Sequence, residues 1–286
     1  MRIGRRYPAL GWMQIASALA ALASAPSRGA RPPADTANRE ERRTFRPIAD
    51  DPAQQTTVLY LNLEGATTHS GPDDSRTGQS SVCAAKIPAF DHRPYGDDAA
   101  SVASQLTQLV QAYFADFDLQ VVSKRPTSPQ PYQMLIIGGD PGLCGLAEGL
   151  GGLAPLDCQD SEARSVGFVF SAPLTELIGV ALVAAHEAGH LFGLPHLRDP
   201  CDVMTNALCP AGTKAFVDTF SAVAPDHEGR CGLREASSYQ WLHERLGPAP
   251  PADQTTAGCN TSHAISSPPI VLLLLIFWRR QAWAKR

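Results

Sequence analysis

Three histidines and a glutamate lie within the sequence VAAHEAGHLFGLPHL, residues 183–197, although the whole chain has only eight histidines. His186 and His190 are four residues apart, so on a helix they project from one face, about one turn from each other. This spacing lets two imidazole nitrogens reach one metal ion. Glu187 directly follows the first histidine and therefore points beside the ion, where a carboxylate can hold a metal-bound water. The chemistry that this pattern indicates is metal-assisted hydrolysis.

A third histidine completes the arrangement. Gly193 is a natural helix stop, and it lets the backbone turn so that His196 can approach the same ion, with Pro195 stiffening the approach. Three neutral imidazoles leave a fourth position open, which distinguishes a catalytic zinc site from a structural one. We therefore predict one catalytic zinc ion with three histidine ligands: His186, His190 and His196.

The alternative is that these residues are core histidines of an apolar helix, because a single HExxH match has a real false-positive rate. Here the histidines, the glutamate and the glycine fit one pattern together. The preceding apolar sequence ELIGVALVAA, residues 176–185, also predicts the buried helix that the motif needs.

The complete pattern HExxHxxGxxH resembles the signature of the metzincin metallopeptidases, in which a methionine turn follows. Met204, in the sequence CDVMT, lies eight residues after His196. In that family this methionine forms a hydrophobic floor beneath the metal and is not a ligand. Asn206 stands where some metzincins carry a tyrosine that assists at the metal, and the cysteine switch of the matrix metallopeptidases is absent, so the subfamily stays open.

The resemblance covers residues 57–247 and implies an α+β catalytic domain. Its expected parts are a twisted, mostly parallel β-sheet, an active-site helix, and an irregular C-terminal subdomain that ends in a helix. It implies that a zinc-activated water attacks the scissile carbonyl while Glu187 takes the proton as general base and passes it to the leaving amine. It also implies that an extended peptide pairs with the upper edge strand of the sheet, which we expect within residues 163–170.

The hydrophobic pattern predicts the elements that position this site. Alternating apolar residues predict four strands, at 56–65, 119–126, 132–139 and 165–171. Helical spacing predicts one helix at 97–114 and a last one at 234–246. The active-site helix is expected to start from Ser171 as N-cap, with Pro173 in its first turn, and to end near Phe192.

Composition and charge narrow the class of protein. Hydrophobic residues make up 44% of the chain and charged residues 18%, as is typical of a globular protein with a real core. Residues 31–259 hold 16 basic and 28 acidic residues. A body this acidic is repelled by phosphate backbones, so we expect no nucleic-acid partner.

Both ends of the chain resemble targeting segments. Residues 1–25 place three arginines before an Ala/Leu-rich run, which predicts a signal peptide, and residues 26–56 are a linker or a short pro-segment. Residues 248–258 are a proline-rich linker. Residues 259–286 contain a polar spacer, a short apolar run at 270–278 and arginines, and a bilayer needs about 20 apolar residues.

The tail at 259–286, with its Gly-Cys pair, resembles the myxobacterial type of C-terminal sorting signal found on bacterial surface proteins. The resemblance implies that export and sorting machinery removes the tail at Cys259 and holds the protein at the cell surface or outer membrane, or releases it to the medium. A short permanent membrane anchor is the alternative.

Six cysteines lie before the proline-rich linker, and in an exported protein they predict three disulfides. The sequence cannot choose among the pairings. Local pairs Cys144–Cys158 and Cys201–Cys209 are reasonable, and we interpret Cys83 as a disulfide partner.

We therefore predict an exported zinc endopeptidase that acts on proteins or peptides. One alternative is a catalytically silent binding module that keeps the fold, although such a module has no physical need for Glu187. Another is a zinc hydrolase that acts on a non-peptide bond, which the methionine turn disfavours.

Overall fold

The computed structural model describes residues 56–127, 129–158 and 163–251. The predicted signal peptide, most of the predicted pro-segment and the predicted sorting signal with Cys259 lie outside the described residues. Within the described part of the chain, no helix has the length and apolar character needed to cross a membrane.

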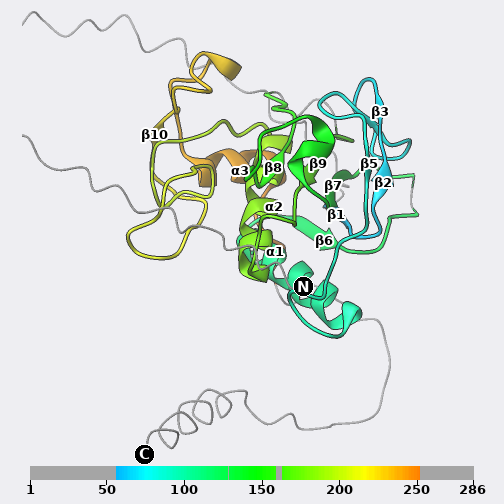
Figure 1. Cartoon of the computed structure of the whole chain (residues 1–286). Helices are drawn as coiled ribbons and strands as arrows, with labels where there is room; N and C mark the ends of the chain where they lie inside the picture. Colours follow the sequence, from blue (N-terminus) through cyan, green and yellow to red (C-terminus); the bar gives the residue numbers. More distant parts are fainter. Residues whose placement is uncertain (1–55, 128, 159–162, 252–286) are drawn as a thin grey trace, which may run out of the picture. The chain divides into compact units, whose positions relative to one another are not determined.

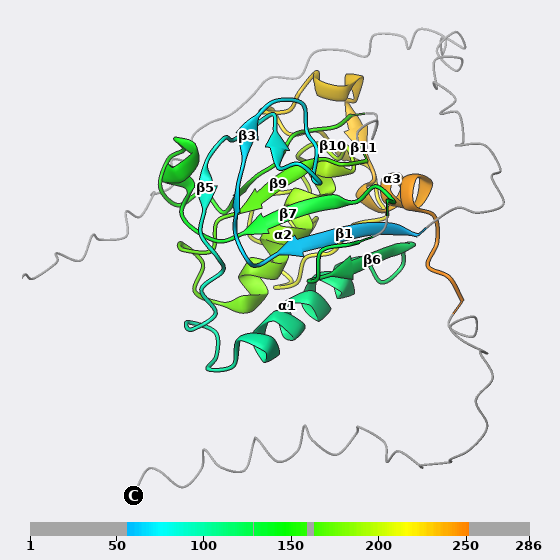
Figure 2. The same ribbon diagram turned by 90° about the vertical axis from the view of Figure 1, so that its right-hand side faces the viewer.

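A five-stranded sheet, in the order β6–β1–β7–β9–β8, forms the centre of the fold (Figure 2). The first four strands of this order are parallel, and β8 runs antiparallel to β9. The bounds are β1 Thr57–Asn62, β6 Leu119–Val122, β7 Gln133–Ile137, β8 Gly152–Leu153 and β9 Val166–Val169. The sheet is mostly parallel, as predicted, and the structure is that of a mixed α/β protein.

Two helices cover one face of the sheet, as Figures 1 and 2 show. They are α1 (Ala99–Tyr113) and α2 (Leu177–Leu191). Asp98 caps α1, since its side chain accepts a hydrogen bond from the backbone N–H of Ala100. Alternation along β1 explains the layers: Leu59 packs with the helices, whereas Tyr60 belongs to the hydrophobic cluster on the other face.

Residues 66–87 contribute to the cover of that second face. They form short paired strands: β2 (Ala66–Thr67) with β5 (Lys86–Ile87), and β3 (His69–Ser70) with β4 (Gln79–Ser80). Ile87 and Cys83 pack with Met134 and Phe168 of the sheet. Both faces of the sheet are therefore covered, which agrees with its continuous apolar strands.

The chain after α2 has little regular structure. It contains β10 (Ser221–Ala222), a single turn of 3-10 helix, Arg230–Gly232, and β11 (Glu235–Ala236), and it leads into α3 (Ser238–Leu246). The yellow and orange ribbon in Figure 1 follows this path. After α3 the backbone N–H of Ala249 donates to the carbonyl of Asp116 at 2.9 Å, so backbone pairing continues past residue 247.

Two predicted helix starts are wrong. Helix α2 begins at Leu177 and not beside Ser171, because the hydroxyl of Tyr95 donates to the carbonyls of Ser171 and Leu174 and holds this stretch as a turn. Helix α3 begins at Ser238 and not at residue 234.

The later start of α3 has a local cause. Ala236 pairs with Ser221 in the β10–β11 ribbon, and the side chain of Ser237 then caps the helix by accepting from the N–H of Gln240 at 3.1 Å.

Six cysteines form three disulfides, as predicted. The bonds are Cys83–Cys144, Cys158–Cys231 and Cys201–Cys209. The predicted pair Cys201–Cys209 is confirmed and the pair Cys144–Cys158 is wrong. Each of these two cysteines is instead bonded to one far away in the sequence, with separations of 61 and 73 residues.

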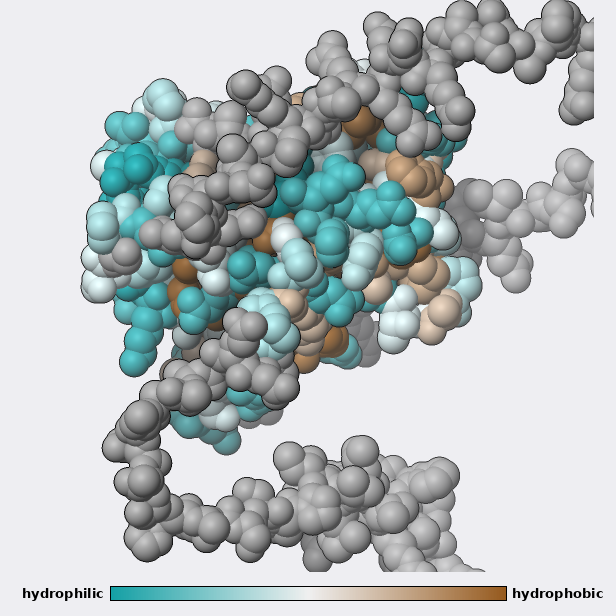
Figure 3. All heavy atoms as spheres, turned by 180° about the vertical axis from the view of Figure 1, so that it is seen from behind, coloured by the Kyte–Doolittle hydropathy of each residue, from teal (hydrophilic) through white to brown (hydrophobic). Residues whose placement is uncertain are grey.

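Outside the grey atoms, the face of the molecule in Figure 3 is mostly hydrophilic, with hydrophobic residues in separate patches. This agrees with the location of the large apolar side chains, which lie mainly in the two clusters on either side of the sheet.

Candidate metal centre

The C-terminal half of α2 carries the first two histidines into the interior. His186 is 9% exposed and His190 is 5% exposed, and their ring centroids lie 4.8 Å apart. The helix is apolar on nearly every side here, because it packs against the sheet, α1 and the segment that follows it. Burial of two imidazoles on one helix face is the arrangement that their four-residue spacing predicts.

The end of α2 brings the third histidine to the same place. Gly193 has a φ of +84°, a left-handed conformation that favours glycine, and a Cβ at this position would lie 2.5 Å from the carbonyl oxygen of Asp157. The chain then turns back, and the ring of His196 lies 5.0 Å from that of His186 and 4.8 Å from that of His190. The structure therefore brings the three predicted histidines together.

One nitrogen of each ring is already engaged. Each imidazole uses Nδ1 in a hydrogen bond: His186 with the carbonyl of Val203 at 2.8 Å, His190 with the carbonyl of Leu194 at 2.7 Å, and His196 with the carboxylate of Asp226 at 2.6 Å. Carbonyls and carboxylates only accept, so Nδ1 carries the proton in every ring. Each Nε2 is then left with a lone pair in the neutral state.

Two of these lone-pair nitrogens lie close to each other. Nε2 of His186 is 3.1 Å from Nε2 of His196. With both rings neutral, this pair has no proton to share, so the contact is not a hydrogen bond. Two nitrogens bound to one tetrahedral zinc at 2.0–2.1 Å would lie about 3.3 Å apart. The donor set therefore fits a single zinc-sized cation.

Burial keeps the helix histidines in the protonation state that a metal requires. It lowers the pKa of His186 to about 4, with a further contribution from the nearby His196, and it lowers the pKa of His190 well below its usual value. Neutral imidazoles bind metal ions, whereas imidazolium does not. The assignment of the histidines as ligands stays a prediction, which this geometry makes specific.

Glu187 is buried beside the histidines and against β8. Its carboxylate occupies the space that a side chain at Gly152 would need, so a larger residue at position 152 would displace it. Burial raises the pKa of Glu187 to about 8. A cation held by the neighbouring imidazoles would favour the ionised carboxylate. Its role as general base stays a prediction.

The sheet edge on this side is not where the sequence places it. Strand β9, Val166–Val169, falls within the predicted range 163–170, but it is paired with β8 and is therefore an inner strand. The edge is β8, Gly152–Leu153. A two-residue strand with a glycine carries no alternating pattern, and for this reason sequence periodicity misses it.

Met204 is fully buried against α2. Its sulfur occupies the space that a side chain at Gly189 would need, which explains the glycine between the two helix histidines. The turn is fixed by the N–H of Leu197, which donates to the Met204 carbonyl at 2.9 Å, and by Asp202, which accepts from the Met204 N–H at 2.7 Å. Asn206, two residues later, is exposed.

Two site residues were missed by the sequence analysis, Asp226 and His227. Asp226 is the partner of His196 described above, and the ring of His227 stacks on His196 with centroids 4.0 Å apart and planes 3° from parallel. The Asp-His pair within APDHEG is the only sequence signal for them, and nothing in that pattern shows that it folds back onto His196.

The pKa shifts of His227 and Asp226 agree with their position beside His196. Burial, helped by the neighbouring His196, lowers the pKa of His227 to about 4. Partial burial opposes ionisation of Asp226, but its hydrogen bond with His196 lowers its pKa on balance. The lowered pKa values keep the rings of His186, His190 and His227 neutral beside the ionised carboxylate of Asp226.

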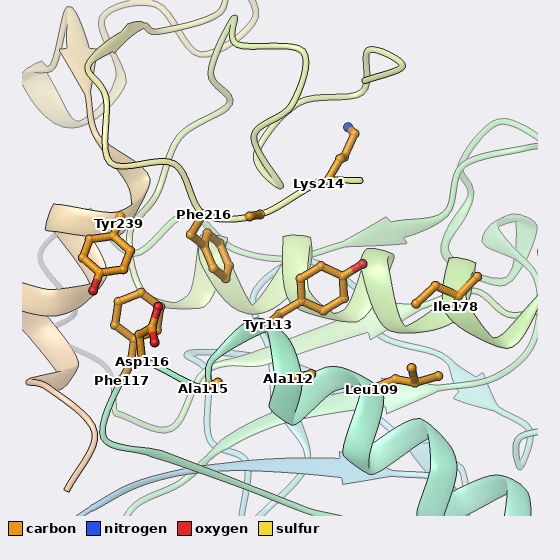
Figure 4. Close-up of a pocket in the computed structure, with 11 residues that line it drawn as sticks. Leu109, Ala112, Tyr113, Ala115, Asp116, Phe117, Ile178, Lys214, Phe216 and Tyr239 are labelled. Atoms are coloured by element: carbon orange, nitrogen blue, oxygen red, sulfur yellow. The ribbon is translucent and has the colours of Figure 1, made fainter. Parts of the chain in front are cut away.

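A separate cavity of about 290 Å³ lies between the end of α1, the start of α2 and residues 214–216 (Figure 4). Its lining includes neither a histidine nor a glutamate. Lys214 at its rim donates to the carbonyl of Thr205, so the cavity borders the turn after Met204 but does not contain the histidine cluster.

No family model matches the chain, and no curated protein matches it. Among solved structures, the chain is similar to a crystal structure described as a zinc-dependent peptidase from Methanocorpusculum labreanum. The two are 13% identical, the likeness covers 53% of this chain and 90% of that chain, and the TM-score is 0.30.

Proposed function

We propose that this protein is an exported, zinc-dependent endopeptidase of the metzincin type. The metal ligands are His186, His190 and His196, and Glu187 is the general base. The observation that carries the proposal is the convergence of three Nε2 lone pairs, with two of them 3.1 Å apart, beside a buried carboxylate. The sequence HExxHxxGxxH and the buried Met204 support the metzincin assignment.

In this proposal, the histidines and the glutamate have different roles. Bound zinc would polarise the substrate carbonyl and lower the pKa of a coordinated water towards about 7. The three imidazoles hold the cation through Nε2, and their Nδ1 partners fix the ring orientations. Glu187 accepts the proton from the attacking water and delivers it to the leaving amine. Its burial keeps bulk water from competing for this proton.

A peptide substrate fits the surroundings of the site. Strand β8 forms the sheet edge and lies directly against Glu187, so an extended chain pairing with β8 would pass beside the base. Leu150, next to this strand, is 42% exposed and can contact apolar substrate side chains. This support favours a peptide over a small non-peptide substrate.

One experiment separates the endopeptidase from a silent binding module. The purified protein is incubated with a mixed peptide library, with and without a chelator, and products are identified by mass spectrometry. We expect cleavage that the chelator abolishes. Glu187→Gln should retain zinc and lose turnover by about 10²–10⁴-fold, because general acid–base assistance is lost.

Glu176→Gln is the matched control, since Glu176 lies exposed at the other end of the same helix. It should cleave like the wild type. Zinc-loaded protein that binds peptides without cleaving any of them would support the binding module and contradict the endopeptidase.

Export and surface retention are part of the proposal. The three disulfides are consistent with an extracellular protein, because such bonds persist in oxidising compartments. We infer that sorting machinery removes the tail at Cys259 and holds the mature protein at the cell surface. Mass spectrometry of the surface protein tests this, and peptides from residues 270–286 still attached to it would contradict it.

A further inference from the structure

The segment 223–227 surrounds His196. The N–H of Ala224 donates to the His196 carbonyl at 2.8 Å, and the N–H of His196 donates to Nδ1 of His227 at 3.0 Å. The side-chain Nδ1 of His196 donates to Asp226 at 2.6 Å. Every hydrogen-bonding group of His196 except Nε2 is therefore engaged by this one segment. Nε2 is the atom that faces His186.

Stacking adds a second restraint on the same ring. The planes of His196 and His227 are 3° from parallel at a centroid distance of 4.0 Å. A hydrogen bond to Nδ1 alone leaves the imidazole free to tilt about that bond. A parallel ring against its face removes the tilt. Together, the two contacts fix both the tautomer and the plane of His196.

The helix histidines do not need such side chains. His186 and His190 stand on α2, and their Nδ1 atoms donate to backbone carbonyls. His196 stands after the end of the helix, on irregular backbone, and its side-chain partners are both side chains. Among the three histidines, His196 is therefore the one whose ring orientation a single side-chain substitution can change.

We propose that Asp226 and His227 form a clamp that positions His196 as the third metal ligand. The clamp consists of the Asp226 carboxylate on Nδ1 and the His227 ring on the face of the imidazole. The carboxylate also raises the basicity of the imidazole and offsets part of the charge of the bound cation. Both are positioning residues, and the inference rests on the zinc site of the proposed function.

The test is the zinc affinity of the purified protein, measured by competition with a chromophoric chelator. Asp226→Ala should weaken zinc binding about 10–100-fold, the usual effect of losing a partner of a metal-bound histidine. Asp226→Asn should weaken it less, because the amide oxygen still accepts from Nδ1 while the charge is gone. His227→Ala should also weaken binding, and His227→Phe should recover part of the loss by restoring the stacked ring.

Glu228→Gln is the matched control, because Glu228 is the next residue, is exposed, and loses the same charge. It should bind zinc like the wild type. Loading each variant with cobalt gives an independent readout, since the visible absorption of bound cobalt reports ligand geometry. The clamp variants should change this spectrum and the control should not. Asp226 is largely exposed, so its variants should keep the wild-type melting temperature without metal.

The outcomes separate the two proposals. If the wild type binds one zinc and the Asp226 and His227 variants bind it equally well with unchanged cobalt spectra, the clamp is overturned and the proposed function stands. If the wild type binds no zinc, both are overturned. If it binds two, and Asp226→Ala removes only the second, these residues are ligands of a separate ion and the clamp is overturned.

Discussion

His186 and His190 stand on a helix whose place is set by a buried sheet, whereas His196 stands on irregular backbone whose place is set by hydrogen bonds and disulfides. The first region has continuous apolar strands and two helices packed on them. The second region, residues 192–237, contains only two-residue strands and a single helical turn. One disulfide, Cys201–Cys209, lies within it, and another, Cys158–Cys231, joins it to an earlier part of the chain. The proposed metal site lies where the two regions meet.

This difference shows how a site can combine two kinds of stability. The packed sheet and helix hold His186, His190 and Glu187 with many contacts that are individually weak. The irregular segment holds His196 with a few specific contacts, and we expect the loss of any one of them to have an effect. Substitutions of similar size should therefore have different consequences in the two regions.

We expect the largest loss of stability when a disulfide of the irregular region is removed. Cys158–Cys231 ties the irregular segment to the chain before β9 and closes a loop with a sequence separation of 73. Replacing both cysteines by serine should lower the free energy of unfolding by about 4 kcal/mol, from the entropy of the unfolded chain. Denaturant titration measures this. Because Cys231 follows the clamp closely in the chain, zinc affinity should fall as well.

The shorter bridge is the matched control. Cys201–Cys209 spans only 8 residues, so its double serine variant should cost about 2.5 kcal/mol by the same reasoning. Equal losses from the two bridges would show that loop length does not set their contribution.

The next largest effect should come from Asp202, which joins the methionine turn to α3. Its carboxylate accepts from the N–H of Met204 at 2.7 Å, the hydroxyl of Ser238 at 2.5 Å and the N–H of Val217 at 3.3 Å. Asp202→Ala should lower the free energy of unfolding by about 3 kcal/mol, because buried donors lose their acceptor. A loss below about 1 kcal/mol would mean that the turn is held by other contacts.

The Asp202→Asn variant tests the same contacts through the pH dependence of the free energy of unfolding. Burial raises the pKa of Asp202, although its hydrogen bonds act in the opposite direction. The folded protein therefore binds this proton more tightly than the unfolded chain does. The advantage of aspartate over asparagine should be greatest below about pH 4 and should decline as the pH rises through the folded pKa. An advantage that grows with pH would contradict the raised pKa.

A smaller effect is expected inside the packed region. Gly189→Ala places a methyl group where the sulfur of Met204 lies. Overpacking costs about 1–3 kcal/mol, and the better helix propensity of alanine returns about 1 kcal/mol, so the net loss should be near 1 kcal/mol. Gly179→Ala on the same helix has open space around it and should stabilise the protein instead. Thermal unfolding of the two variants measures both the expected loss and the expected gain of stability.

Much of the packed region could be predicted from the sequence. The repeat of Val102, Leu106 and Val110 gives α1, and these residues are buried as the helical period requires. The spacing of His186 and His190 gives their shared face. Such patterns are local, so a sequence contains them directly.

The irregular region could not be predicted in the same way. Asp226 reaches His196 across 30 residues without any periodic signal. The late start of α2 depends on the hydroxyl of Tyr95, 76 residues before Ser171. The pairing of Cys158 with Cys231 depends on the finished fold. Each of these is a single long-range contact, and no local pattern encodes it.

We expect the three imidazoles from these two regions to bind one metal ion. X-ray absorption spectroscopy of the zinc-loaded protein tests it most directly, because it reports the number and type of atoms around the ion. We predict one zinc per chain with three imidazole nitrogens at about 2.0–2.1 Å and one oxygen, and two imidazoles in whatever zinc the His196→Ala variant retains. Sulfur among the ligands, or a wild-type spectrum with only two imidazoles, would contradict the account.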